Sequence, residues 1–580
     1  MKDILLYLKP YIGRMLAGLI IKISGTFMDL GLPWVLAYII DDVIPLGKVS
    51  LIMIWGIVML LLSIGARWGN ITANRMASRV AADTVKRLRH DLFGKIEQLS
   101  GAQLDYYTIP SLVSRMTTDT YNIHQMVGMM QRLGVRGPII LIGGIVITLT
   151  LEPVLTLVLL AILPLLSFVV YLVSKKGIPI YSAGQGAVDR MIRTVRENIS
   201  GIRIVKALSK SDYEKSRFQK INNEVSEKEM KAGITMAVIN PTMNILLNVG
   251  LTVVVVIGAY RVNSGASEVG KIVAFLSYFT MILNAVLMVT KIFVILSKGS
   301  ASASRISNVL NAGEELKLYR EEEYQDSPLE EEYHVEFDKV SFSYNSASDC
   351  IRNINFQIKR GESLGIIGST GSGKTTLVNL LLRYYDIDEG SIFINGKDIR
   401  TIPVQNLREK FGVVFQNDSI FADTVKENIN FDRGLPDDRI RMAARDAQAG
   451  EFIEKLDGRY EYPVSAKGTN LSGGQKQRVL ISRALAGKPE ILILDDSSSA
   501  LDYKTDSNLR GAIRRNYKDT TTIMIAQRIS SIMHMDHILV MEDGEMIGYG
   551  MHEELLDSCG VYREIYQSQM GEDEPEAAGV

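Results

Sequence analysis

Long stretches without a charged side chain are the feature that most constrains how this chain can fold. Residues 49–66 carry no charge and are closed by Lys48 and Arg67. This length is about the minimum for a helix that crosses a hydrocarbon layer roughly 30 Å thick. The sequence therefore predicts that part of the chain spans a membrane.

Five further stretches support the same argument, although charges interrupt two of them. Arg132 and Arg136 lie toward one end of the third stretch, and Lys22 and Asp29 lie within the first. Charged side chains inside a span are costly, and they mark polar cavities or ion pairs. The six expected spans are about 11–42, 49–74, 126–151, 153–175, 232–261 and 270–300.

The connections between the expected spans alternate in charge. Two long connections, after the second and fourth spans, are rich in Lys and Arg, whereas the other links are short and nearly free of them. The positive-inside rule places the basic connections and both termini in the cytoplasm. Apolar residues recur at helical spacing through 80–96 and 192–208, so both connections are expected to be helical. The sequence predicts a multi-pass protein of the cytoplasmic membrane.

Beyond about residue 300 the chain changes character, because no further span is expected there. The predicted domains are a membrane domain at 1–310, an acidic linker at 311–333, a second domain at 334–572 and a tail at 573–580. A net charge of −1 gives no broad positive field, so nucleic acid is not an expected partner. The two cysteines are too few for a disulfide framework or a structural zinc site.

A phosphate-binding loop introduces the chemistry of the second domain. An apolar run at 364–367 leads into a glycine-rich loop, Lys374 and Thr375, and then an apolar-periodic helix at 376–385. Backbone N–H groups of such a loop surround phosphates, Lys374 reaches the terminal phosphates, and Thr375 can ligate Mg²⁺. The expected nucleotide-binding residues are Gly368, Ser369, Thr370, Gly371, Ser372, Gly373, Lys374, Thr375 and Thr376.

Two more motifs follow along the chain. A buried strand at 491–495 ends in Asp495, which the carboxyl edge of a parallel sheet would bring to the Mg²⁺ beside Thr375. Upstream, a helix begins after Leu471 with glycines that leave its first backbone amides open, which is typical of an anion site. The residues of this second site are Ser472, Gly473, Gly474 and Gln475.

The phosphate loop, the LSGGQ sequence at 471–475 and the Asp495 strand stand in the order of one known family. The chain resembles an ATP-binding cassette (ABC) exporter half-transporter. The resemblance implies an α-helical membrane domain of six transmembrane helices with long cytoplasmic extensions, fused to an α/β P-loop nucleotide-binding domain. It also implies ATP and Mg²⁺ as cofactors, membrane lipid as surroundings, and two cassettes that sandwich two ATP molecules.

The resemblance assigns further roles that spacing alone does not. Tyr344 is expected to stack on adenine, and Gln416 to contact Mg²⁺ and the attacking water. The stretches 104–123 and 201–218 resemble the two cytoplasmic coupling loops. Asp502 belongs to a loop at 499–502 that resembles the one crossing to the opposing cassette.

Two residues depart from the family pattern at the site of hydrolysis. Asp496 stands where the family usually has a catalytic Glu, which shortens the reach of the carboxylate by about 1.5 Å. Gln527 replaces the usual switch histidine and cannot become a cation or relay a proton. Ala466 stands where many exporters carry a Glu that contacts the coupling loops. We expect slow hydrolysis at this site; the alternative is that Asp496 remains an adequate base in a homodimer.

The intact residues at 472–475 point to the partner. They can complete a competent site on another subunit, which predicts a heterodimer with a second, non-identical half-transporter. The chain thus resembles the degenerate-site subunit of bacterial heterodimeric multidrug exporters.

The expected function is ATP-driven export of amphipathic or hydrophobic substrates, namely drugs, lipids or peptides, by alternating access. A nucleotide-gated channel or sensor is the alternative. Lys22 and Asp29 either line a polar cavity or form a packing pair. Four methionines either adapt to hydrophobic cargo or fill space: Met236, Met243, Met281 and Met288.

Overall fold

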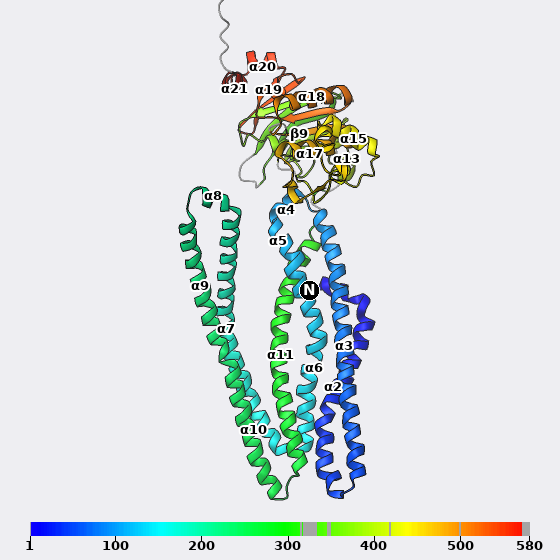
Figure 1. Ribbon diagram of the computed structural model, residues 1–580, viewed down its shortest axis with the longest axis vertical. Coiled ribbons are helices and arrows are strands. Elements are labelled where there is room, and N and C mark those ends of the chain that lie inside the picture. The colour runs from blue at the N-terminus through cyan, green and yellow to red at the C-terminus, as the bar shows by residue number, and fades with distance from the viewer. Residues whose placement is uncertain are drawn as a thin grey trace, which may run out of the picture. The chain divides into compact units, whose positions relative to one another are not determined.

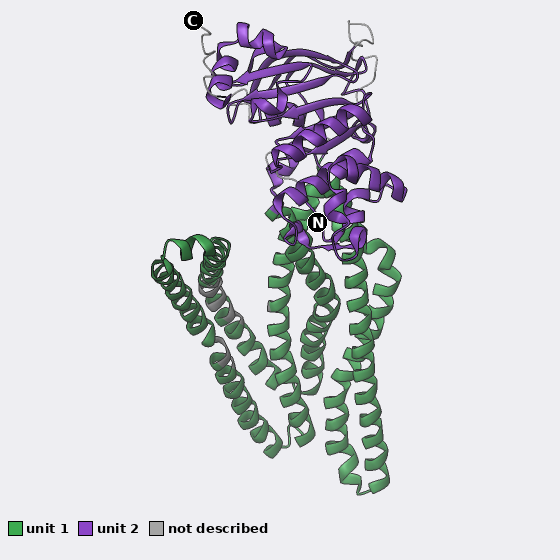
Figure 2. Cartoon of the chain, turned by 45° about the horizontal axis from the view of Figure 1, so that its top comes forward, with its two compact units in different colours: residues 1–97, 110–312 green, residues 98–109, 313–580 purple. Residues whose placement is uncertain are grey.

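The structure, a computed structural model, describes residues 2–313, 316, 333–344, 350–416, 419–497 and 500–570. The chain clusters into two compact units (Figure 2). Unit 1 comprises Met1–Glu97 and Pro110–Ala312, and unit 2 comprises Gln98–Ile109 and Gly313–Val580. Most of the expected acidic linker and the whole tail lie outside the described residues.

Unit 1 is built from long helices (Figure 1). They are α2 (Ile12–Tyr38), α3 (Val49–Glu97), α6 (Thr120–Leu151), α7 (Pro153–Ser200), α9 (Ser211–Ala237), α10 (Ile239–Asn263) and α11 (Val269–Leu310). The short helices and helical turns are α1 (Lys2–Leu8), η1 (Lys9–Tyr11), η2 (Ile39–Val43), η3 (Ile44–Leu46), α5 (Ile109–Ser114), η4 (Arg115–Asp119) and α8 (Ile202–Ala207). Two groups form, in which α2, α3, α6 and α11 pack together, and α7 packs against α9 and α10.

Small residues allow α2 and α3 to approach closely. A Cβ atom on Gly25 would lie 3.3 Å from the carbonyl oxygen of Ala66, and one on Gly69 would lie 3.5 Å from the Cα atom of Gly25. Within a membrane, van der Waals packing of this kind takes the place of a hydrophobic driving force between helices.

The expected count of six spans is not confirmed. Among the described residues, five segments are long and apolar enough to cross a membrane: Ile4–Leu46, Val49–Glu97, Ile109–Leu151, Asn244–Asn263 and Val269–Leu310. The fourth expected span begins α7, but its described apolar stretch, Pro153–Leu166, is shorter than a span requires.

The basic connections are helical, with one interruption. The stretch 80–96 lies in α3, which continues unbroken from the second span, as predicted. The stretch 192–208 is divided at Gly201, where α7 ends and α8 begins. The prediction is therefore confirmed for the first connection and only in part for the second.

Unit 2 contains two main sheets. The larger has the order β12-β11-β3-β10-β9-β6, in which all neighbours are parallel except the antiparallel β11–β12 pair. Its strands are β3 (Ser363–Gly368), β6 (Phe411–Val414), β9 (Ile491–Asp495), β10 (Thr521–Ile525), β11 (His537–Glu542) and β12 (Glu545–Gly550). The smaller antiparallel sheet has the order β2-β1-β4-β5. Its strands are β1 (Tyr333–Phe342), β2 (Ile351–Lys359), β4 (Glu389–Ile394) and β5 (Lys397–Asp398), and β7 (Asp423–Thr424) pairs separately with β8 (Pro463–Val464).

Helices surround these sheets. They are α4 (Gly101–Tyr107), α12 (Lys374–Leu381), α13 (Val404–Glu409), α14 (Val425–Asn430), α15 (Asp437–Asp446), α16 (Gly450–Ile453), α17 (Gly473–Ala486), α18 (Tyr503–Asn516), α19 (Ile529–Ile532), α20 (His552–Ser558) and α21 (Gly560–Met570), with turns η6 (Arg459–Glu461) and η7 (Ala466–Gly468). Every residue of β9 and β10 is buried, as continuous apolar strands of a covered parallel sheet should be.

The helix predicted at 376–385 is wrong at its end. α12 stops at Leu381, and Arg383 adopts the left-handed φ of 50°. The guanidinium of Arg383 is buried, and it donates to Asp386 at 2.7 Å and to the backbone carbonyl of Arg400 at 3.3 Å. This buried arginine network turns the chain out of the helix.

Candidate functional site

The phosphate loop connects β3 to α12, as the sequence predicts. A Cβ atom on Gly373, whose φ is 95°, would lie 2.6 Å from Cγ2 of Ile351, so a side chain has no room there. Lys374 begins α12 and its ammonium donates to the carbonyls of Gly368 at 3.0 Å and Ser369 at 2.7 Å. Burial lowers the pKa of Lys374. The side chain of Lys374 thus folds back over the loop and closes it.

The proposed metal pair meets where α12 begins and β9 ends. The hydroxyl of Thr375 donates to Oδ2 of Asp495 at 3.2 Å. Asp495 is only 2% exposed, and burial raises the pKa of its carboxyl. A hydroxyl beside a buried carboxylate fits a hard divalent cation such as Mg²⁺, which prefers oxygen ligands and would favour the charged form of the acid.

Two of the expected residues, Gln416 and Gln527, donate to one carboxylate oxygen of a third, Asp496. Oδ2 of Asp496 accepts hydrogen bonds from Nε2 of Gln527 at 2.9 Å and from Nε2 of Gln416 at 3.4 Å. Asp496 follows β9 with a left-handed φ of 48°, and its N–H donates to the carbonyl of Ile525 in β10. Burial raises the pKa of Asp496, although the hydrogen bond from Gln416 opposes that shift.

The residues of the second predicted anion site lie at the start of α17. The Ser472 hydroxyl accepts from the N–H of Gln475 at 3.3 Å, and the Gln475 side chain accepts from the N–H of Ser472 at 2.9 Å. This capping box fixes the helix start, while Ser472 and Gly473 stay exposed. A Cβ atom on Gly474 would lie 3.1 Å from the carbonyl of Ala500, so the helix start also contacts the loop that leads to Asp502.

Two family models match this chain. A family model described as ABC transporter transmembrane region matches residues 15–286, and one described as ABC transporter matches residues 351–499. The ABC transporter ATP-binding protein YfiB of Bacillus subtilis is 36% identical over 582 residues, which cover 100% of both chains. The chain belongs to the ABC transporter family. It is an ATP-binding half-transporter, in which ATP drives transport.

Two further proteins extend the comparison. The ABC transporter ATP-binding protein Rv1273c of Mycobacterium tuberculosis is 32% identical, and the match covers 97% of each chain. A solved structure of a bacterial Atm1-family ABC exporter with ATP bound has a TM-score of 0.82. It covers 97% of this chain and 98% of the other, and at 23% identity it shows a shared fold.

The transporter also presents the aromatic side chain expected near adenine. Tyr344 is 41% exposed, and its ring packs edge-on against Tyr385 with centroids 5.0 Å apart. Its hydroxyl lies 3.3 Å from the Thr376 hydroxyl and accepts from Asn379 at 3.3 Å, so the ring stands beside α12. Asp502 caps α18 through the N–H of Thr505 at 3.0 Å, and Ser499 lies outside the described residues.

The first expected coupling stretch, 104–123, overlaps α4, which begins at Gly101. In unit 2 of the transporter, the N–H of Gly101 donates to the carbonyl of Tyr384 at 2.9 Å, and the Tyr385 hydroxyl donates to Asp105 at 2.7 Å. A Cβ atom on Gly101 would lie 2.7 Å from Cζ of Tyr385. α4 is therefore folded onto the nucleotide-binding unit, and its start lies before residue 104.

Sequence reasoning missed Gln569, at the end of α21. Its side-chain oxygen accepts from the N–H of Ile529 at 2.7 Å, and its nitrogen donates to the carbonyl of Gln527 at 2.8 Å. Gln569 also lines a cavity of about 370 Å³ together with Asp496. No motif marks this residue, because its partners are backbone atoms some forty residues earlier.

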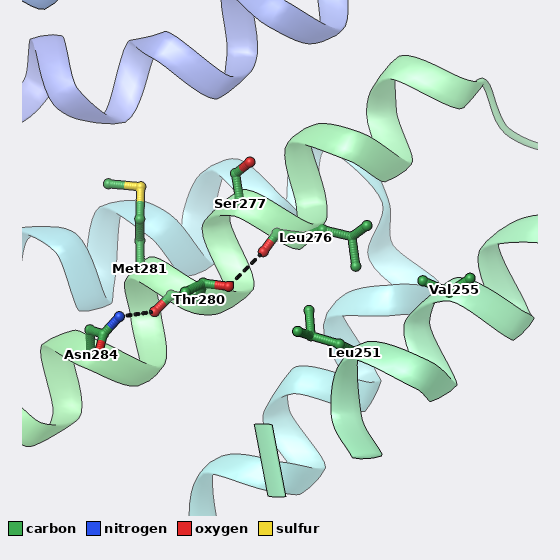
Figure 3. Close-up of a pocket in the computed structure, with 7 residues that line it drawn as sticks. All are labelled: Leu251, Val255, Leu276, Ser277, Thr280, Met281 and Asn284. Carbon is green, nitrogen blue, oxygen red and sulfur yellow. Dashed lines mark hydrogen bonds between the residues drawn. The ribbon is translucent and has the colours of Figure 1, made fainter. Parts of the chain in front are cut away.

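The membrane domain of the transporter has a pocket between α10 and α11 (Figure 3). The pocket measures about 580 Å³ and is lined by Leu251, Val255, Leu276, Ser277, Thr280, Met281 and Asn284. Thr280 and Asn284 donate to carbonyls of their own helix at 3.1 and 3.0 Å. Met281 is the one of the four predicted methionines in this lining, and the side chain of Met243 lies outside the description.

Proposed function

We propose that this half-transporter is the slowly hydrolysing subunit of a heterodimeric exporter of amphipathic or hydrophobic compounds. The observation that carries the proposal is the environment of Asp496. Its carboxylate is the acceptor for two amide side chains, Gln416 and Gln527. Of the three, only Asp496 can accept a proton from the attacking water near neutral pH.

The short reach of Asp496 supports slow hydrolysis at this site. A general base needs a heavy-atom distance of about 2.6–3.2 Å to the water that it deprotonates. The Asp side chain is one methylene shorter than the usual Glu, and a misplacement of about 1 Å can lower a rate roughly a hundredfold. The amide of Gln527 donates a hydrogen bond to the carboxylate oxygen, but it cannot take up or relay a proton.

The remaining site residues are suited to binding. Gly368 to Thr376 would surround the phosphates of ATP, and Tyr344 would stack on the adenine. Thr375, Gln416 and Asp495 would hold Mg²⁺, which neutralises developing phosphate charge when bound. Lys374 would exchange its loop carbonyls for the terminal phosphates. The proposal is therefore a site that retains ATP longer than it cleaves it.

The partner is proposed to be a second, non-identical half-transporter. Ser472 and Gly473 are exposed at the start of α17, so they are free to complete a phosphate site on another cassette. The tip at α8 also presents apolar side chains, with Ile204 and Leu208 both 64% exposed. An apolar tip of this kind suits a docking surface. In this arrangement both nucleotide-binding units lie in the cytoplasm.

The pocket between α10 and α11 is the proposed contact for cargo. Four of its seven lining residues are apolar, among them Met281 as an adaptable side chain, and the other three carry a hydroxyl or an amide. Such a surface suits drugs, lipids or apolar peptides rather than strongly hydrated solutes.

The decisive experiment compares the full chain alone with the chain co-expressed with a half-transporter that carries Glu and His at the matching positions. ATP turnover and ATP-dependent uptake of an amphipathic dye into inside-out vesicles are measured. We expect little turnover alone and robust uptake with the partner. Robust turnover by the chain alone contradicts the proposal, and dye flux that needs bound ATP but no turnover indicates a channel.

A further inference from the structure

A charged cluster lies where α2, α3 and α6 meet. Its residues differ from those that line the pocket of Figure 3. The guanidinium of Arg136 contacts Oδ2 of Asp29 at 3.0 Å, and the Asn70 amide donates to the same oxygen at 3.1 Å. The ammonium of Lys22 donates to Asn74 at 3.0 Å. Asp29, its two donors, Lys22 and Asn74 thus link the three helices.

The charges in this cluster do not balance. The electrostatic partners of Lys22 are Arg136, Arg132 and Asp29. Lys22 therefore interacts with two cations and one carboxylate, and that carboxylate is already paired with Arg136 at 3.0 Å. Arg132 donates to the carbonyl of Gly128 in its own helix at 3.0 Å, so this contact does not neutralise its charge.

The surroundings make this imbalance costly. At 1.5 Å per residue, Arg136 lies about 22 Å from the C-terminal end of α6, which is inside a hydrocarbon layer roughly 30 Å thick. Lys22 is 3% exposed. Unpaired charge within a membrane is expensive, and such residues usually pair or contact a ligand. A counter-charge from outside the chain would resolve the imbalance.

The cluster also has an opening and an unused donor. The side chains of Arg136 and Asp29 are 30% and 21% exposed, so one edge of their ion pair is accessible. Nε of Arg136 is buried without a hydrogen-bond partner. Because a guanidinium presents its N–H groups as a planar fork, Arg136 can hold Asp29 on one side and a second oxyanion on another.

We propose that Lys22, Arg132 and Arg136 form a binding site for the anionic head group of an amphiphile, a phosphate monoester or a carboxylate. Asp29 orients Arg136 and Asn70 and does not contact the ligand. Only the statement that the bound amphiphile is the exported cargo rests on the proposed function. Binding is therefore measured without ATP, so that the two proposals can fail separately.

A purely structural role for the cluster makes a different prediction. If the cluster only holds the helices together, replacing either Asp29 or Arg136 would lower the stability of the protein. The protein would then bind anionic and cationic ligands equally. As an anion site, the cluster has opposite responses to the two changes. Asp29→Asn keeps the shape and an acceptor oxygen while it removes the competing negative charge, whereas Arg136→Gln removes a cation.

The test uses the full chain in phosphatidylcholine nanodiscs, with dodecyl phosphate and dodecyltrimethylammonium as probes of equal tail length. We expect dodecyl phosphate to bind at least about tenfold more tightly than the cation. Arg136→Gln should weaken phosphate binding about tenfold, and Asp29→Asn should strengthen it about threefold or more. Arg14→Gln is the matched control, because Arg14 of α2 also forms an ion pair with a neighbouring helix, to Asp83 of α3 at 2.9 Å, and both side chains are well exposed.

Two further arms keep the result unambiguous. Arg132→Gln, which breaks only a contact within its own helix, should weaken phosphate binding even if Arg136→Gln fails to fold. Nanodiscs that contain phosphatidylglycerol distinguish a lipid head group from a free amphiphile. If the site binds the lipid head group, phosphatidylglycerol competes and lowers the apparent affinity for dodecyl phosphate. Equal affinity for the two probes, or weaker phosphate binding in Asp29→Asn than in Arg14→Gln, would overturn the proposal.

Discussion

Gln569 is predicted to hold closed the loop that carries Gln527. Its side-chain amide makes two hydrogen bonds to that loop, from the N–H of Ile529 and to the carbonyl of Gln527. Gln569→Ala removes both. A neutral hydrogen bond contributes about 0.5–1.5 kcal/mol net, so the two together contribute about 1–3 kcal/mol. The population of the open loop should rise by about 5- to 150-fold.

Hydrogen exchange of the purified full chain measures this opening directly. The amide of Ile529 exchanges only when its bond to Gln569 breaks, so its protection should fall by the same factor. Gln567→Ala is the control, because Gln567 is exposed on the same helix. Gln569→Glu should lose less protection, since a carboxylate still accepts from Ile529 but cannot donate to Gln527.

The pattern of exchange decides the outcome. Faster exchange confined to α19 and the residues just before it supports a local clamp. Equal protection of Ile529 in Gln569→Ala and Gln567→Ala would refute the reasoning. If protection falls across β10 and β11 as well, the alanine variant has destabilised the whole unit, and equal protection in Gln569→Glu and the wild-type chain would then refute the donor contact.

Three other predictions concern the nucleotide site and its sheet. Asp496→Glu and Gln527→His together should raise turnover beyond the sum of the single changes, with a coupling free energy of at least about 1 kcal/mol. Turnover is measured with the proposed partner's competent site disabled, and additive recovery would contradict the prediction. Ser472→Trp should abolish turnover of the proposed heterodimer, while Lys374→Ala should mainly lower nucleotide occupancy. Equal and complete losses would show that the two sites are equivalent. Burial lowers the pKa of His334 from 6.5 to about 4, so between these values the unfolded chain binds a proton that the folded chain does not. The free energy of unfolding should therefore fall as pH drops from 6.5 to about 4. In His334→Gln the thermal unfolding temperature should depend less steeply on pH over this range.

The parts of the site that sequence could predict are those where one segment carries the chemistry. The phosphate-loop motif is contiguous, and the strand and helix expected on either side of it are present. The meeting of Thr375 with Asp495, far apart in sequence, followed from the rule that carboxyl ends of parallel strands share one edge. The place of Gln416 and Gln527 beside Asp496 depended on the family resemblance instead.

What sequence could not predict depends on long-range contacts without a motif. The bond from Tyr385 to Asp105 joins residues in different expected domains, so composition alone puts α4 in the wrong unit. Arg383 lies in an apolar-periodic stretch, yet its buried guanidinium ends the helix early. A residue whose role is set by distant backbone atoms, such as Gln569, has no local pattern to recognise.

The docking of α4 limits how chains of this kind can be recombined. The polypeptide passes between its two units after Glu97, after Ile109 and after Ala312. A hybrid gene that exchanges the cassette at residue 313 would keep Gly101 and Asp105 but discard the tyrosines that they contact. Cassette exchange therefore requires a matching exchange of this short inner segment, and lineages that swap only the C-terminal half would inherit mismatched contacts at α4.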